Sequence, residues 1–300
     1  MLSIARIANN RSSGYDKSIG PPKECAQRGR FDRNANNRRK PQRMTQPISE
    51  SNREFVGSLA KGLNVIRVFG KDSPTMSVSE VARSTGNTRA GARRLLLTLH
   101  SLGYLRTDGR RFSLAPKTLE LGYSFLSSRG WLSIASPLLE NLKTTLTESV
   151  SVTMLEDIDV VYIARFPADR VLTVSMDVGS RRPAYCTAMG RVLLGELPEL
   201  EVRAILDRSQ LVAHTPRTVV DKAALMEEFR KARRQGHAIV DQELEDGLVA
   251  ASVPLRDCHG AVLAAVNVCG HASQLALDDL ERRCLPALRD TVNRISRSVV

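Results

Sequence analysis

Apolar residues recur at helical spacing from about Ser58 onward, where a long polar stretch ends. The first patterned segment predicts a helix that Gly70 closes. Its apolar positions are Leu59, Leu63, Ile66 and Val68–Phe69. Because these positions return every three or four residues, the segment is expected to bury one stripe against a neighbouring element.

Two further helices are predicted directly afterwards. Ser77-Val78-Ser79-Glu80 forms a capping box, with Ser77 as N-cap and Glu80 three residues later. Thr85-Gly86-Asn87 is a tight break, and Thr88 is placed to cap a third helix from about Arg89 to Leu102. The apolar positions of that third helix lie on one face, at Ala92, Leu95, Leu96, Leu99 and Leu102.

A hairpin is predicted after the third helix. Asp108-Gly109 separates Tyr104–Thr107 from Arg111–Leu114, and Asp-Gly between alternating residues is a strong hairpin signal. Helix, short helix, break, long helix and hairpin follow one another in the order of a winged helix-turn-helix. In that motif the start of the third helix enters the major groove of DNA.

Long hydrogen-bond donors stand where such a motif meets DNA. Arginine binds guanine O6 and N7 bidentately or pairs with phosphates, and small residues let a helix approach the bases. The predicted DNA-binding residues are Thr88, Arg89, Ala90, Arg93 and Arg94 on the third helix and Arg106, Arg110 and Arg111 in the hairpin. An ordinary helical bundle with a solvated basic face is the alternative, and it leaves the coincidence of these signals unexplained.

The second half of the chain mixes short strands with helices without regular alternation. Strands are expected at Val150–Leu155, Val160–Arg165, Leu172–Met176, His237–Val240, Ala250–Leu255 and Val262–Val268. A helix is expected from Pro116, and a break around Ser127–Gly130 separates it from a further helix to about Thr147. Later helices are expected at about 188–195, 199–207, 222–235 and 277–298. This order predicts an α+β fold with a mostly antiparallel sheet.

The charge of the 300-residue chain, formally +12, is concentrated in its first 115 residues. Residues 1–57 carry 12 basic and 5 acidic groups, residues 58–115 carry 10 and 3, and residues 116–300 carry 22 and 24. The split indicates that the N-terminal part meets a polyanion and that the remainder does not.

The segment from Asn9 to Arg43 is rich in Arg, Asn, Ser, Pro and Gly and poor in large apolar side chains. Such a segment buries too little surface to offset the entropy of ordering, which predicts disorder. It is interpreted as a basic arm on nucleic-acid phosphates, as a product of start-site choice with Met44 as the alternative start, or as an Arg-rich transit peptide.

Several function classes lack the residue patterns they need. The five cysteines form no C-x-x-C, and the five histidines show neither metal-ligand nor protease spacing, so we expect no metal. No P-loop or dinucleotide fingerprint is present, so we expect no cofactor, and a Cys186–His271 or Cys269–His271 pair has no orienting third group. The sequence has neither a long apolar run nor a secretory signal, and we predict a cytoplasmic protein that is not an enzyme.

Five segments resemble IclR-type transcriptional regulators. They are Ser58–Ile66, Thr85–Arg89, Leu102–Leu105, Leu119–Tyr123 and Gly179–Leu194. The resemblance covers about Phe55 to Val300. Pro183-Ala184-Tyr185-Cys186-Thr187 is similar to the PcaR/PobR branch, which regulates the catabolism of protocatechuate, 4-hydroxybenzoate and β-ketoadipate. Gly91 departs from this branch, which has Ala there, and a helical Gly costs about 1 kcal/mol relative to Ala.

The resemblance implies a domain plan. Residues 55–115 form a winged helix-turn-helix, 116–130 a linker helix that dimerises, and 131–300 a GAF-like domain for effector binding and oligomerisation. Residues 1–54, outside the resemblance, are the basic extension that composition predicts to be disordered. Expected partners are a double-stranded DNA operator, a small organic acid effector, and further copies of the chain in a homodimer or homotetramer.

An effector site is expected in the second half. The segment after Tyr185-Cys186-Thr187 places backbone N–H groups at a helix start, which suits a carboxylate. By the resemblance, Asp241, Ala250, Asn267 and Cys269 match pocket positions. The full predicted set is Tyr185, Cys186, Ala188, Met189, Asp241, Ala250, Asn267 and Cys269, with Arg181 or Arg182 as a carboxylate clamp or as surface residues.

These expectations combine into a ligand-responsive regulator of aromatic acid catabolism genes. Tyr185 either stacks on an aromatic ring or fills the core, and Cys186 and Cys269 are read as small buried hydrophobes. The alternatives are a regulator of another small-carboxylate pathway and, in a different class, a ligand-free architectural DNA-binding protein.

Overall fold

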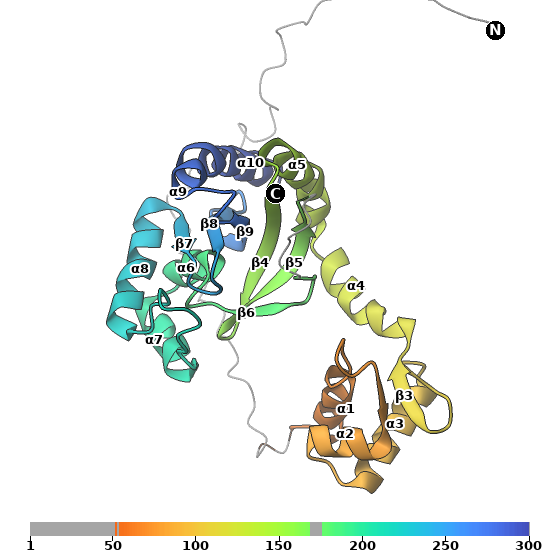
Figure 1. Cartoon of the computed structure of the whole chain (residues 1–300). Coiled ribbons are helices and arrows are strands. Elements are labelled where there is room, and N and C mark those ends of the chain that lie inside the picture. Colours follow the sequence, from red (N-terminus) through yellow and green to blue (C-terminus); the bar gives the residue numbers. More distant parts are fainter. Residues whose placement is uncertain (1–51, 53, 169–175, 300) are drawn as a thin grey trace, which may run out of the picture. The chain divides into compact units, whose positions relative to one another are not determined.

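The computed structural model describes residues 52, 54–168 and 176–299 (Figure 1). Apart from Asn52 and Glu54, the extension predicted for residues 1–54 lies outside the described residues, and so does Met44. None of the helices described is long and apolar enough to cross a membrane.

The first described module has three helices and a small sheet. The helices are α1 (Gly57–Arg67), α2 (Val78–Thr85) and α3 (Arg89–Ser101). The strands β1 (Thr75–Ser77), β2 (Leu105–Thr107) and β3 (Arg111–Leu114) form an antiparallel sheet in the order β1-β3-β2. The predicted helices and hairpin are confirmed. Strand β1 was not predicted, because three residues are too few to show the alternation of apolar and polar side chains that marks a strand.

The predicted caps of α2 and α3 are present. Ser77 N–H donates to Glu80 Oε2 at 2.6 Å, and Glu80 N–H donates to Ser77 Oγ at 3.4 Å. Gly86 ends α2 in the left-handed conformation, with φ of 68°. Thr88 Oγ1 then accepts from Gly91 N–H at 3.1 Å and caps α3. These bonds satisfy N–H groups that helix starts leave without partners, and they fix where both helices begin.

The core of this module differs from the sequence expectation at two helices. On α1 the buried residue is Val65, while Leu59 and Leu63, predicted as core, are exposed. On α3, Ala92, Leu96 and Leu99 are buried as predicted, but Leu102 lies beyond the end of the helix and is exposed. The face that a short helix buries depends on what packs against it, which spacing alone does not specify.

Helices of the expected kind follow the hairpin. They are the 3-10 turn η1 (Pro116–Thr118), α4 (Leu119–Ser127) and α5 (Gly130–Leu146). The predicted break falls at Ser128 and Arg129, between α4 and α5. Helix α4 has no buried residue, and Leu119, Leu121, Tyr123 and Phe125 are exposed on it.

The second half is built on a six-stranded antiparallel sheet in the order β6-β5-β4-β9-β8-β7. The strands are β4 (Ser149–Glu156), β5 (Asp159–Phe166), β6 (Arg181–Pro183), β7 (Ala238–Asp241), β8 (Leu248–Arg256) and β9 (Val262–His271). The predicted α+β class is confirmed. Of the strand predicted at Leu172–Met176 only Met176 is described, outside any strand, and β6 was not predicted.

Helices cover both faces of this sheet (Figure 1). Helices α5 and α10 (Leu285–Ser298) pack on one face, with the short α9 (Leu277–Asp279) and the π-helical turn η2 (Leu280–Cys284) leading into α10. On the other face lie α6 (Ala188–Gly195), α7 (Glu199–Arg208) and α8 (Lys222–Gln235). Successive strand residues alternate between the two cores, so Ala264 and Val266 of β9 join one and Ala265 the other.

Helix α6 has every residue buried. A Cβ on Gly190 would lie 1.9 Å from the backbone oxygen of Ala184, and a Cβ on Gly195 would lie 2.7 Å from that of Phe229. These approaches are closer than any side chain permits. Glycine at both positions therefore lets α6 lie directly against neighbouring backbone, which holds the helix in one place.

Gly190→Ala is expected to lower the free energy of unfolding by at least about 2 kcal/mol, because backbone must move to admit the methyl group. Urea unfolding followed by circular dichroism measures the change. Gly130→Ala is the matched control, since a Cβ at Gly130 meets nothing within 4 Å. Equal unfolding midpoints for the two variants would contradict the close packing of α6.

Candidate functional site

The start of α3 presents a continuous exposed surface. Thr88, Arg89, Ala90, Arg93 and Arg94, the residues predicted to meet DNA, are all exposed. The intervening Ala92 is fully buried, so the arginines face away from the core of the module. The geometry leaves these guanidinium groups accessible to a groove.

The hairpin between β2 and β3 is ordered by its aspartate. Asp108 Oδ1 accepts from the N–H groups of Arg111 at 2.7 Å and Arg110 at 2.8 Å, and these bonds lower the pKa of Asp108. Gly109 takes φ of 93°, which favours glycine. The side chains of Arg106 and Arg110 are exposed beside this turn.

Arg111, predicted only as a DNA contact, is hydrogen-bonded within the protein. Its Nε donates to Thr75 Oγ1 at 3.0 Å and its Nη2 to the Thr75 carbonyl at 2.7 Å, and Nη2 lies 3.3 Å from Glu80 Oε2. The side chain thus ties β3 to β1 and to the capping box of α2. The sequence carries no sign of this role, because Thr75 and Arg111 are 36 residues apart.

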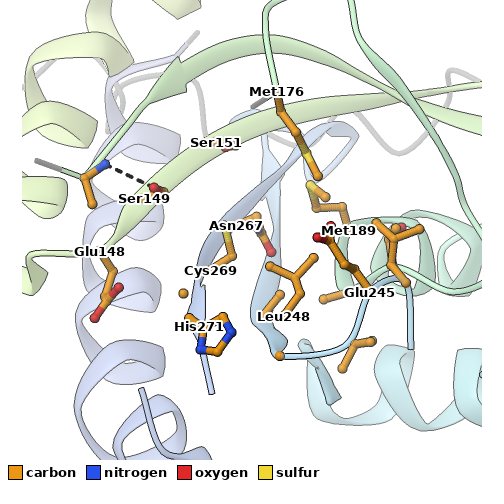
Figure 2. Close-up of a pocket in the computed structure, with 18 of the residues that line it drawn as sticks. Glu148, Ser149, Ser151, Met176, Met189, Glu245, Leu248, Asn267, Cys269 and His271 are labelled. Atoms are coloured by element: carbon orange, nitrogen blue, oxygen red, sulfur yellow. Dashed lines mark hydrogen bonds between the residues drawn. The ribbon is translucent and has the colours of Figure 1, made fainter. Parts of the chain in front are cut away.

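A cavity of about 280 Å³ lies among the sheet, α6 and the loop between β7 and β8 (Figure 2). Its size suits a small organic molecule. The lining residues used below are Glu148, Arg165, Cys186, Ala188, Met189, Gly247, Ala250, Asn267, Cys269 and His271.

Six of the eight predicted effector residues line this cavity: Cys186, Ala188, Met189, Ala250, Asn267 and Cys269. Asn267 and Cys269 are two residues apart on β9 and face the same side, as strand geometry requires. Ala250 of β8 is the cross-strand partner of Cys269, which brings it to the same wall. Residues from three separate segments therefore meet at one place.

Tyr185 and Asp241 lie outside the cavity lining. Tyr185 is 2% exposed, its hydroxyl donates to the Val212 carbonyl at 2.7 Å, and its ring stacks on His214. Of the two interpretations of Tyr185, the geometry favours core packing. Asp241 forms an ion pair with Arg217.

Among the described residues, Arg165 of β5 lines the cavity, and neither Arg181 nor Arg182 does. Arg181 Nε donates to Asp159 Oδ2 at 3.0 Å and its Nη2 to the Glu156 carbonyl at 2.9 Å. The predicted carboxylate clamp, Arg181 or Arg182, is close in sequence to Tyr185. Arg165 reaches the cavity through the fold of the sheet, and no local spacing marks it.

Glu148 and His271 are cavity residues that sequence reasoning did not single out for this site. Two glycines make room for them. A Cβ on Gly270 would lie 2.6 Å from Glu148 Oε2, and a Cβ on Gly247 would lie 2.3 Å from His271 Nε2. Gly247 also has φ of 81°, a conformation that L side chains rarely adopt.

Helix α6 begins at the cavity. Thr187 Oγ1 caps it by accepting from Gly190 N–H at 3.1 Å, while Ala188 and Met189 of its first turn line the cavity. The N–H groups of a first turn have no acceptor within the helix, and the helix dipole adds positive potential there. This end of the cavity is suited to an anion.

Asn267 supplies a second polar feature. Its residue is 1% exposed, and among the described residues its Oδ1 has no hydrogen-bond partner. Figure 2 shows the amide oxygen directed into the cavity. A buried acceptor without a donor is costly, so a ligand hydroxyl there would be stabilised.

The cavity thiols are neutral at physiological pH. Burial raises the pKa of Cys186 to about 12 and that of Cys269 to about 11. The thiolate is the nucleophilic form, so neither cysteine is activated for covalent chemistry. In the part of the chain that the structure describes, no group of three or more His, Cys, Asp or Glu residues is arranged to hold a metal ion.

Known proteins match both halves of the chain. The sequence model of the IclR helix-turn-helix domain matches residues 58–109, and that of the C-terminal domain of bacterial IclR transcriptional regulators matches residues 123–297. The chain belongs to the IclR family. It is therefore a transcriptional regulator and not an enzyme.

Individual relatives agree with this membership. The Pca regulon regulatory protein of Pseudomonas putida is 42% identical, over 78% of this chain and 81% of that protein. The p-hydroxybenzoate hydroxylase transcriptional activator of Acinetobacter baylyi is 34% identical, over 82% of this chain and 93% of that protein. The crystal structure of a transcriptional regulator from Rhodococcus sp. RHA1 superposes with a TM-score of 0.73 over 82% of this chain and 98% of that one, and the two sequences are 43% identical.

Arg110→Ala and Arg111→Ala in this IclR-family regulator are expected to differ in the salt dependence of DNA binding. A lost phosphate contact lowers the slope of log affinity against log salt by about 1, which we expect for Arg110. Arg111→Ala is expected to weaken binding with an unchanged slope, because Arg111 positions the hairpin. Fluorescence anisotropy with an operator duplex, over a range of salt concentrations, measures the affinity and the slope for each variant. A decrease of the slope in Arg111→Ala equal to that in Arg110→Ala would show that Arg111 contacts DNA.

Proposed function

We propose that this protein is a ligand-responsive, cytoplasmic regulator of genes for aromatic acid catabolism, and that its effector is a hydroxylated aromatic acid. The observation that carries the proposal is the cavity that opens onto the first turn of α6 and holds the unpaired amide oxygen of Asn267. The two relatives named for the Pca regulon and for p-hydroxybenzoate hydroxylase support the pathway.

The carboxylate of the effector is assigned to the first turn of α6. The backbone N–H groups of Ala188 and Met189 are the donors, and they need no side-chain rearrangement to bind. Because α6 is held by its glycines against Ala184 and Phe229, these donors are aligned before an effector binds. Preorganised donors reduce the entropic cost of binding.

A ring hydroxyl is assigned to Asn267. Its Oδ1 accepts, and an aromatic hydroxyl donates, so the pair satisfies an acceptor that is otherwise buried alone. A carboxylate at this point would meet an oxygen instead of a donor. The cavity therefore favours an acid that has a carboxylate at one end and a hydroxyl further along the ring.

DNA is assigned to the exposed start of α3 and to the hairpin. Arg89, Arg93 and Arg94, flanked by Thr88 and Ala90, face the major groove, and Arg106 and Arg110 reach the backbone. A dimer places two recognition helices at the spacing of two operator half-sites. The proposed dimer contact is made by the exposed apolar side chains of α4, of which Leu119 and Tyr123 are the most exposed. An effector that binds one domain arrangement more tightly then shifts occupancy of the operator.

Isothermal titration calorimetry with 4-hydroxybenzoate, protocatechuate and β-ketoadipate tests the effector class. We expect heat with the two hydroxybenzoates. Heat with β-ketoadipate alone would favour another small-carboxylate pathway. No heat with any of the three, together with a DNA footprint that ignores sequence, would favour an architectural DNA-binding protein.

Asn267→Leu is expected to weaken binding of 4-hydroxybenzoate by about 10- to 100-fold, the value of a hydrogen bond to a buried acceptor. Binding of benzoate, which has no hydroxyl, is expected to stay within about threefold. Tyr185→Phe is the matched control, since its hydroxyl bonds to Val212 and lies outside the cavity lining. Equal losses for both ligands in Asn267→Leu would remove the hydroxyl assignment.

Arg93→Ala is expected to weaken operator binding by about 1–3 kcal/mol if the guanidinium contacts a base bidentately. The measurement is anisotropy at fixed salt, on the operator and on a scrambled duplex of equal length. Arg203→Ala, at an exposed position of α7, is the control. Unchanged operator affinity would place Arg93 among the solvated surface residues.

A further inference from the structure

A buried ion pair lies just behind the effector cavity. Arg191 of α6 is 3% exposed and Glu243, in the loop between β7 and β8, is 6% exposed. Arg191 Nη2 lies 2.7 and 2.8 Å from the two carboxylate oxygens of Glu243. Neither residue lines the cavity, so neither is expected to touch the effector.

Arg191 belongs to the element that supplies the anion site. It follows Ala188 and Met189 by less than one turn on the same immobilised helix. Its Nη1 also lies 3.4 Å from Glu228 Oε2 on α8, which holds the guanidinium from a second side. The position of this charge is thus set by α6 and α8 together.

Glu243 begins a second part of the cavity wall. The four residues after it, Leu244 to Gly247, all line the cavity. Glu243 Oε2 accepts from Val219 N–H at 3.1 Å, and its carbonyl accepts from Thr218 Oγ1 at 2.6 Å. The loop is closed on itself by Gly247 N–H, which donates to Gln242 Oε1 at 2.9 Å. One carboxylate therefore joins the cavity wall to α6 and to the segment at Val219.

We propose that Arg191 and Glu243 are positioning residues, which hold the wall 244–247 at a fixed separation from the first turn of α6 and so set effector affinity. The effector part of this inference rests on the proposed function. Hydrophobic residues of similar volume often stabilise a protein as well as a buried ion pair does, so stability alone does not call for these charges. A guanidinium on a carboxylate is directional, and it fixes a distance that apolar contact leaves adjustable.

The charges are also felt inside the cavity. The negative charge of Glu243 helps raise the pKa of Cys186, a lining residue, while Arg191 acts in the opposite sense. The two charges thus act in opposite directions on this lining residue. Removal of Arg191 alone would leave a negative charge beside the anion site and repel a carboxylate, so the two residues are best replaced together.

The test is the double variant Arg191→Met/Glu243→Leu in the full chain. Its control is Arg230→Met/Glu199→Leu, which removes an exposed pair with separations of 2.7 and 3.0 Å between α7 and α8. Amide hydrogen exchange of residues 242–248 reports the wall without any ligand. Calorimetry with 4-hydroxybenzoate reports affinity, and anisotropy reports DNA binding without effector.

We expect exchange in 242–248 to accelerate about tenfold or more and effector affinity to fall by at least about tenfold, with DNA binding unchanged, in the double variant only. An exchange rate in this segment of the double variant equal to that of the wild-type protein would overturn the proposal. Should the double variant not fold, Arg191→Lys keeps the charge but loses the planar guanidinium, and it is expected to accelerate amide exchange in the same segment. An unchanged exchange rate in Arg191→Lys would also overturn the proposal. If wild-type protein binds none of the acids, the proposed function fails while the exchange result still decides the positioning role.

Discussion

The burial of α6 is the constraint on which the effector half of the molecule depends. Its glycines admit the backbone of Ala184 and Phe229 at distances no side chain allows, so the helix has one position between the sheet and α8. The first turn of such a helix is a fixed set of N–H donors. The cavity, the assigned carboxylate and the buried Arg191 all take their places from it. A helix free to slide would offer the same chemistry without preorganisation.

Polar groups around the cavity divide the work of recognition. Donors at the start of α6 favour an anion, the oxygen of Asn267 favours a hydroxyl, and burial keeps the two cysteine thiols neutral. Behind them, the buried carboxylate of Glu243 is paired with the guanidinium of Arg191. Under the proposed function, ligands are distinguished by where these donors and acceptors lie, and neither of the two cavity cysteines is activated to change a ligand chemically.

In the DNA-binding module, arginines of similar appearance serve different ends. All of them are exposed, but Arg111 is in addition hydrogen-bonded to Thr75 and lies beside Glu80. The capping box that begins α2 is therefore also the anchor of the hairpin. One carboxylate, Glu80, accepts from Ser77 N–H in the cap of α2 and lies 3.3 Å from Arg111 Nη2, so it links the helix cap to β3 of the hairpin.

The sequence by itself determined the winged helix-turn-helix and the α+β class, because their signals are local: a capping box, a left-handed glycine, an Asp-Gly turn and apolar periodicity each act within a few residues. It also placed Cys186, Ala188, Met189, Ala250, Asn267 and Cys269 together, through a helix start and a family resemblance. Only the tertiary structure decided that Arg165, Glu148 and His271 join them, that Tyr185 packs in the core and that Arg111 braces the hairpin. Those outcomes depend on strand register and on contacts between residues distant along the chain, such as Tyr185 with Val212, Arg111 with Thr75 and Gly270 with Glu148. The spacing of residues along a chain carries no information about such contacts.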